Sequence, residues 1–175
     1  MKVQTIISIS LFVSLGISCN QKTKTESNDV KVSQISLIDI VDDVSPPPPD
    51  LTSKFKTMQE WLSNVCDENK PKKLIENYEF GLFESRNDYT IYLVGLNKFD
   101  KGDTSYTLIE FEPSNMYFPL PKGEFENLNR EELLNVLVSQ LKDFAGSKKF
   151  KGSFLTNADK ISFVTTGQTI WSKDE

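Results

Sequence analysis

The chain contains no histidine and only two cysteines among its 175 residues. Without histidine, His-based catalytic triads, the HExxH zinc site and the commonest general base at neutral pH are all excluded. Cys19 and Cys66 are too few for a cysteine zinc site or a disulfide-stapled small domain. No glycine falls in a phosphate-loop or dinucleotide-binding pattern. We therefore expect no enzymatic activity, no metal and no cofactor.

Basic residues are also scarce, with 20 lysines and arginines against 25 acidic residues and a net charge of −5. An acidic chain argues against nucleic-acid binding and against electrostatic adhesion to anionic membranes. The acidic tract from Asp100 to Asp103 lacks the alternating oxygen ligands and the terminal glutamate of a calcium loop. A solvated hairpin turn is the favoured interpretation of this tract.

What the chain does have is a distinctive amino terminus, MKVQTIISISLFVSLGISC followed by NQKTKTESND. A basic start, an apolar run too short to span a bilayer and a switch to polar sequence are typical of an export signal. The segment resembles a bacterial lipoprotein signal, in which Ser18 and Ile17 match the residues before the lipidated cysteine and Gly16 replaces the usual leucine. The resemblance implies cleavage before Cys19 and anchoring in the membrane through acyl chains on that residue. Cleavage by the ordinary signal peptidase, or retention as a short anchor, is the alternative.

The resemblance implies a location in the bacterial cell envelope. Asn20 is not the acidic residue that commonly retains such lipoproteins at the inner membrane, which favours the outer membrane. A lipidated Cys19 leaves Cys66 unpaired. We interpret Cys66 as a small apolar residue at the end of a helix, with a reactive or intermolecular thiol as the alternative. A disulfide between the two cysteines would contradict lipidation.

Composition divides the chain into residues 1–18 as signal peptide, 19–50 as flexible tether and 51–175 as a single α+β domain. The run from Pro46 to Pro49 predicts a stiff polyproline II spacer at the boundary. The segment from Val32 to Val44 is too apolar for a plain linker. We favour an edge strand of the domain over a segment that binds a partner by strand addition.

Apolar spacing and punctuation predict two helices. The first starts at Asp50 as N-cap and ends near Asn69. The second has Asn129 as N-cap, Glu132 completing a capping box and Gly146 at its end.

Alternating segments within 78–111 predict an antiparallel meander of three strands, with the tract NKFDKGDT as one of its turns. A final hairpin is predicted over 161–171 with its turn at Thr166 and Gly167. The order α-βββ-α-ββ predicts an α+β fold in which helices pack on one face of an antiparallel sheet.

The segment PSNMYFPLPKGEF, between the third strand and the second helix, is rich in aromatic residues and proline. Such a loop either covers the core or forms a recognition surface, because aromatic and methionine residues are enriched at interface centres. Its candidate partner-binding residues are Met116, Tyr117, Phe118, Leu120 and Phe125.

Two functional classes follow. The first is a lipid-anchored, non-catalytic protein-binding module, such as an immunity-type protein that neutralises a periplasmic toxin, because small, acidic, tethered α+β proteins are similar to that class. The element order is also similar to the secretion-chaperone-like folds, a resemblance of fold alone. The second class is a structural or accessory envelope lipoprotein. In both cases the chain contacts the membrane through acyl chains on Cys19 and does not bind nucleic acid.

Overall fold

The computed structural model describes residues 40–41, 43–68, 70–86, 88–101 and 104–174, all within one unit that spans residues 36–175. Its helices are α1 (Met58–Glu68), α2 (Lys122–Phe125), α3 (Arg130–Ala145) and α4 (Lys148–Lys151), with a 3-10 turn η1 (Phe154–Asn157). Its strands are β1 (Ile40–Val41), β2 (Asn77–Glu84), β3 (Tyr89–Lys101), β4 (Thr104–Phe111), β5 (Tyr117–Pro119), β6 (Lys160–Phe163) and β7 (Gln168–Ser172). The α+β class predicted from the sequence is confirmed.

The strands form one mixed sheet in the order β1-β4-β3-β2-β6-β7, and β5 also pairs with β3. The pairs β2–β3, β3–β4 and β6–β7 are antiparallel, as predicted from the meander and the hairpin. The pairs β2–β6 and β1–β4 are parallel, so the prediction of a purely antiparallel sheet is wrong. Tight turns impose antiparallel pairing, whereas the long helical connection from β5 to β6 permits either direction.

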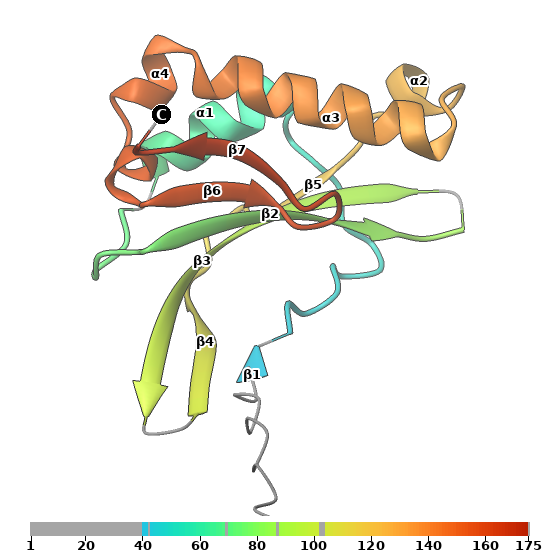
Figure 1. Ribbon diagram of the computed structural model, residues 1–175. Helices are drawn as coiled ribbons and strands as arrows, with labels where there is room; N and C mark the ends of the chain where they lie inside the picture. The colour runs from blue at the N-terminus through green and yellow to red at the C-terminus, as the bar shows by residue number, and fades with distance from the viewer. Residues whose placement is uncertain (1–39, 42, 69, 87, 102–103, 175) are drawn as a thin grey trace, which may run out of the picture. The chain divides into compact units, whose positions relative to one another are not determined.

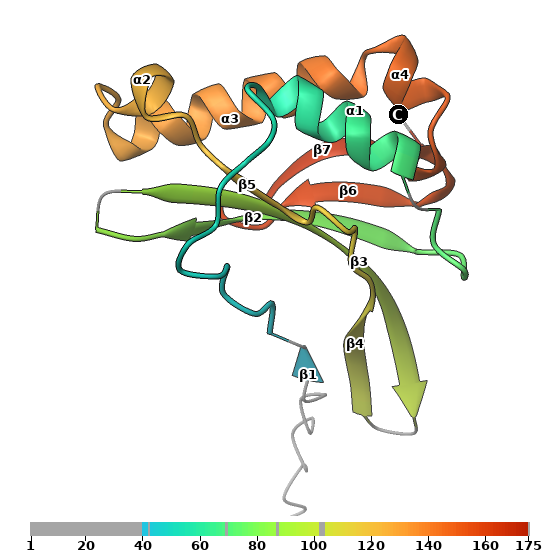
Figure 2. The same cartoon turned by 180° about the vertical axis from the view of Figure 1, so that it is seen from behind.

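Helices α1, α3 and α4 cover one face of the sheet (Figures 1 and 2). The main core lies between these helices and the sheet, because alternate side chains of each strand point to that face. Its fully buried side chains include Trp61 and Leu62 from α1, Tyr78 from β2, Ile91 and Leu93 from β3, Leu137 and Leu141 from α3, and Phe163 from β6.

Helix α1 begins later than the predicted cap at Asp50. The backbone N–H of Glu60 donates to Thr57 Oγ1 at 3.2 Å, and the Glu60 carboxylate accepts from the backbone N–H of Lys56 at 2.8 Å. Thr57 and Glu60 have the spacing of a capping box, in which the two ends of the first turn stabilise each other. The apolar residues before Thr57 therefore lie outside the helix.

Helix α3 and the hairpin of β6 and β7 agree closely with the predictions made from the sequence. The N–H of Glu132 donates to Asn129 Oδ1 at 3.0 Å, and the N–H of Asn129 donates to Glu132 Oε2 at 2.9 Å, so the predicted capping box is confirmed. Gly146 caps the other end. Gly167, in the turn between β6 and β7, has a φ of 70°, a conformation that glycine adopts without strain.

The segment before the predicted domain boundary is part of the folded unit. Strand β1 pairs with β4 at Tyr106 and Thr107, which confirms an edge strand at Ile40–Val41. Residues 32–39 and 42 of the predicted segment lie outside the described residues. Asp43 and Val44 are described and follow the strand. Folded structure therefore starts ahead of residue 51.

The chain on either side of the proline run contacts the rest of the folded unit. The Tyr117 hydroxyl donates to the carbonyl of Ser45 at 2.6 Å, and Val44 packs against a small second apolar cluster on the face of the sheet away from the helices. The run from Pro46 to Pro49 lines a groove with the β2–β3 hairpin. The hydrogen bond from Tyr117 and the apolar contacts of Val44 thus hold the segment just before the prolines, which composition alone did not indicate.

Strands β3 and β4 continue beyond the sheet as a two-stranded arm, residues 96–101 and 104–109, which bends away from the helix-covered face (Figure 1). The pairing shifts register between Gly95 and Leu96, where the bend lies, as expected of a β-bulge. Most of the tract NKFDKGDT, predicted as a turn, therefore lies in strands.

Candidate protein-binding cleft

The predicted partner-binding loop is folded into the molecule. The exposed fractions are 9% for Met116, 0% for Phe118, 8% for Leu120 and 5% for Phe125, and Tyr117 alone is half-buried. The structure therefore places four of the five side chains in apolar clusters and not on a common surface. The burial of these residues agrees with the other interpretation, in which the loop covers the core.

A contact with α1 explains how this loop is held. The Phe118 ring stacks on Trp61 with ring centroids 5.6 Å apart, and the Trp61 indole N–H donates to the carbonyl of Asn115 at 2.6 Å. Burial of two large rings is strongly stabilising, and the hydrogen bond satisfies the polar atom of the indole. Because Phe118 packs against α1, its side chain is buried and does not contribute to a binding surface.

Of the two cysteines, only Cys66 lies among the described residues, and its surroundings are those of a packing residue. Cys19 lies outside the described residues. Cys66 is a free, partly buried thiol on α1. Burial raises the pKa of the Cys66 thiol, and a hydrogen bond with Ser153 and the positive charge of Lys149 offset only part of that rise. A thiol with a raised pKa is less nucleophilic at neutral pH, as expected of a packing residue.

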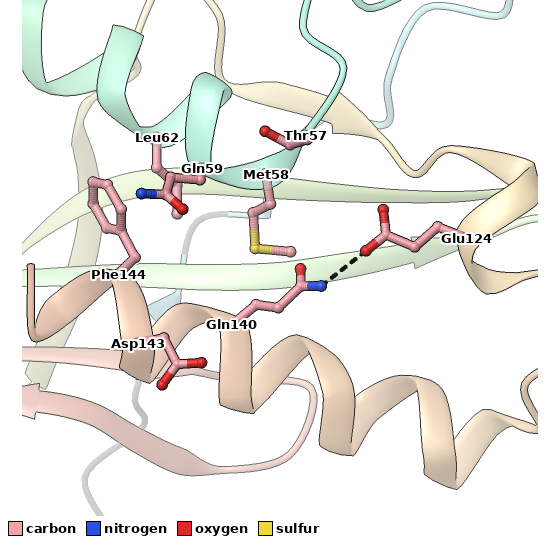
Figure 3. Close-up of a pocket in the computed structure, with 8 residues that line it drawn as sticks. All are labelled: Thr57, Met58, Gln59, Leu62, Glu124, Gln140, Asp143 and Phe144. Carbon is pink, nitrogen blue, oxygen red and sulfur yellow. Dashed lines mark hydrogen bonds between the residues drawn. The ribbon is translucent and has the colours of Figure 1, made fainter.

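The first turn of α1, helix α2 and the second half of α3 enclose a cleft of about 310 Å³. We call it the acidic cleft, and Figure 3 shows the residues that line it. They are Thr57, Met58, Gln59, Leu62, Glu124, Gln140, Asp143 and Phe144.

The acidic cleft has an apolar floor and a polar rim. The floor side chains Met58, Leu62 and Phe144 are 5%, 0% and 6% exposed. At the rim, Gln140 Nε2 donates to Glu124 Oε1 at 3.0 Å, the contact drawn as a dashed line in Figure 3. No lysine or arginine is among the described residues that line the cleft, so its carboxylates are not neutralised from within.

Local structure places these side chains. Helical spacing puts Gln140, Asp143 and Phe144 on one face of α3 and puts Leu62 one turn after Met58 on α1. The short helix α2 presents Glu124 from the opposite side, after a turn in which the Glu124 N–H donates to the Pro121 carbonyl. Sequence reasoning missed this cleft, although the capping pattern at Thr57 was a usable signal for where α1 begins.

This arrangement suits a long cationic side chain of another protein. The methylene stem of a lysine or arginine would lie on the apolar floor, and its charged end would meet carboxylate and amide oxygens at the rim. Among the described residues, no group of three or more Cys, Asp or Glu side chains is placed to hold a metal ion.

Two further cavities, of about 550 and 480 Å³, lie on either side of Tyr89 and Leu120. An ion pair between Lys122 Nζ and Asp88 Oδ1, 2.9 Å apart, stands where they adjoin. Both linings carry both signs of charge, so the cavities have no single charge preference, and the larger one also includes the proline run.

Comparison with known proteins finds no matching family model, no similar curated protein and no similar solved structure. Within the part of the chain that the structure describes, no helix has both the length and the apolar character required to cross a bilayer.

Proposed function

We propose that this chain is a lipid-anchored protein of the bacterial cell envelope that binds another protein and catalyses no reaction. The acidic cleft carries the proposal. Its apolar floor and uncompensated carboxylates would accept a cationic side chain, and the net charge of −5 would favour encounter with a basic partner.

Within this proposal, the partner is a basic secreted protein and the chain acts as an immunity-type protein that neutralises it. A lysine or arginine of the partner inserts into the cleft as an anchor, since interface energy concentrates in a few well-packed contacts. The neighbouring gene product is the first candidate partner to test. If it inhibits growth when exported, co-expression of this chain restores growth.

The cleft is tested with the double variant Glu124→Gln/Asp143→Asn, which removes both negative charges and keeps the side-chain shapes. The matched control is Glu131→Gln/Asp174→Asn, which removes two exposed carboxylates outside the cleft. Each protein is cross-linked in cells and purified from membranes. We expect a stoichiometric partner with the unaltered chain and the control, and its loss from the cleft variant.

Recovery of no stoichiometric partner, or equal recovery with the cleft variant, would overturn the proposal. An accessory envelope lipoprotein would then be the better assignment.

The anchor is tested separately with Cys19→Ala. We expect the protein to move from the detergent fraction to a soluble or unprocessed form. A variant that stays mature and membrane-bound would refute lipidation at Cys19.

A further inference from the structure

We propose that the folded unit itself contacts the membrane, through a basic and apolar patch formed by the loop between α1 and β2 together with the arm. This inference rests on the envelope anchor in the proposed function. The proposed ligand of this patch is anionic phospholipid. This contact is separate from any acyl chain on Cys19.

The loop carries the most exposed large apolar side chain in the described part of the chain. Leu74 is 68% exposed, and the exposed lysines Lys70, Lys72 and Lys73 precede it. In interfacial membrane contact, positive charges attract anionic headgroups and apolar side chains enter the lipid, and this loop presents both kinds of group. The chain as a whole is acidic, so this local excess of positive charge is not a property of its composition.

The arm adds aromatic residues beside the loop. The Asn97 side chain donates to the carbonyl of Leu74 at 3.0 Å and accepts from the N–H of Glu76 at 2.8 Å, so this face of the arm is turned toward the loop. In the antiparallel register, Asn97 faces Leu108, and Phe99 faces Tyr106 two positions further out. The rings of Phe99 and Tyr106 stack 5.9 Å apart and stay half-buried.

Two carboxylates beside the loop have partners within the folded unit, and only Lys73 is used to neutralise one of them. Glu110 pairs with Lys73 at 2.7 Å, and Glu76 Oε2 accepts from the backbone N–H of Lys98 at 2.9 Å. Lys70 and Lys72 form no ion pair with another described residue. Their positive charge therefore remains available to lipid headgroups.

The course of the chain supports the same orientation. Residues 1–39 lead into β1, which pairs with β4 within the arm at Tyr106 and Thr107. An anchor on Cys19 is thus joined to the folded unit at the arm. The acidic cleft lies instead among the helices, on the face of the sheet from which the arm bends away (Figure 2).

The test places a fluorescent reporter in the patch. Leu74→Trp is compared with Val164→Trp, because Val164, at 41% exposed, is an exposed large apolar residue outside the patch. Full-length chains carrying each variant are reconstituted into vesicles of phosphatidylglycerol and phosphatidylcholine with brominated acyl chains. We expect the Leu74→Trp emission to shift to shorter wavelength and lose intensity, while Val164→Trp emission is unchanged.

Flotation of the same vesicles reports the anchor independently. A chain that floats while Leu74→Trp is not quenched would overturn this inference and leave the proposed function intact. A chain that carries no lipid and does not float would instead refute the anchor. Lys70→Gln/Lys72→Gln should weaken quenching in anionic vesicles, and an unchanged signal would refute the role given to these lysines.

Discussion

The ring of Tyr92 lies directly on the backbone of Gly81, its cross-strand neighbour in the β2–β3 pair. A Cβ atom added at Gly81 would come within 2.1 Å of Cζ and Oη of Tyr92. The same ring packs against Phe83, with centroids 5.1 Å apart. An aromatic side chain thus covers the site where β2 lacks a side chain, on the face of the sheet away from the main core.

We expect Gly81→Ala to lower the free energy of unfolding by about 1–3 kcal/mol, because the Tyr92 ring must move away. Urea denaturation measures the change. Gly123→Ala is the control, since a Cβ at Gly123 meets no atom within 4 Å. Adding Tyr92→Ala to Gly81→Ala should cost less than the sum of the two single changes, and strict additivity would contradict the steric account.

Phe118→Ala should lower the free energy of unfolding by about 3–5 kcal/mol, since Phe118 is 0% exposed and stacks on Trp61. Tyr117→Phe removes only the hydrogen bond to Ser45 and should cost about 1 kcal/mol. Thermal and urea denaturation of both variants measure these costs. Equal stability of Phe118→Ala and the unaltered chain would mean that the loop does not cover the core.

Asn129→Ala should cost about 1 kcal/mol, because it removes the side-chain acceptor at the start of α3. Asn135→Ala is the matched control on an exposed position of the same helix and should leave stability unchanged or slightly higher, since alanine is the better helix former. Urea denaturation with circular dichroism of both proteins checks the difference. An equal loss of stability in the two variants would contradict the stated role of the capping box.

Glu79→Gln should stabilise the protein at neutral pH. Burial raises the pKa of the half-buried Glu79 carboxyl, and the charge of Lys160 offsets part of that rise. The folded chain therefore holds its proton to higher pH than the unfolded chain, so ionisation costs stability as pH rises through the folded pKa. The gain should vanish below about pH 4, where both states are protonated. Urea denaturation at neutral pH and below about pH 4 measures the gain in the free energy of unfolding. An equal gain at the two pH values would point to another cause.

The thiol of Cys66 should be alkylated more slowly in the folded chain than in urea, because burial raises its pKa. Lys149→Gln should slow the reaction further, since the Lys149 charge favours the thiolate. Lys151→Gln, an exposed change on the same helix, is the control. Iodoacetamide labelling followed by mass spectrometry over a range of pH gives the rates. Faster labelling of Lys149→Gln would contradict the stated cause.

Much of the local structure could be predicted from the sequence. The capping box at Asn129 and Glu132 and the turn at Gly167 depend on neighbouring residues, so their signals are local. The prediction of Asp50 as the N-cap of α1 is wrong, because the bonds at the start of this helix are made by Thr57 and Glu60. The acidic cleft joins Glu124 to residues of α1 and α3, and no spacing along the chain could bring these together.

By itself the sequence determined the α+β class, the order of the main elements, the antiparallel hairpins and the caps of α3. Each follows from hydrogen bonds and apolar spacing within one segment or across one tight turn. The tertiary structure alone decided that β6 lies parallel to β2, that Phe118 stacks on Trp61 inside the core and that Val44 packs against the sheet. These outcomes depend on the free energy of burying apolar surface between segments far apart in the chain, which local pattern does not encode.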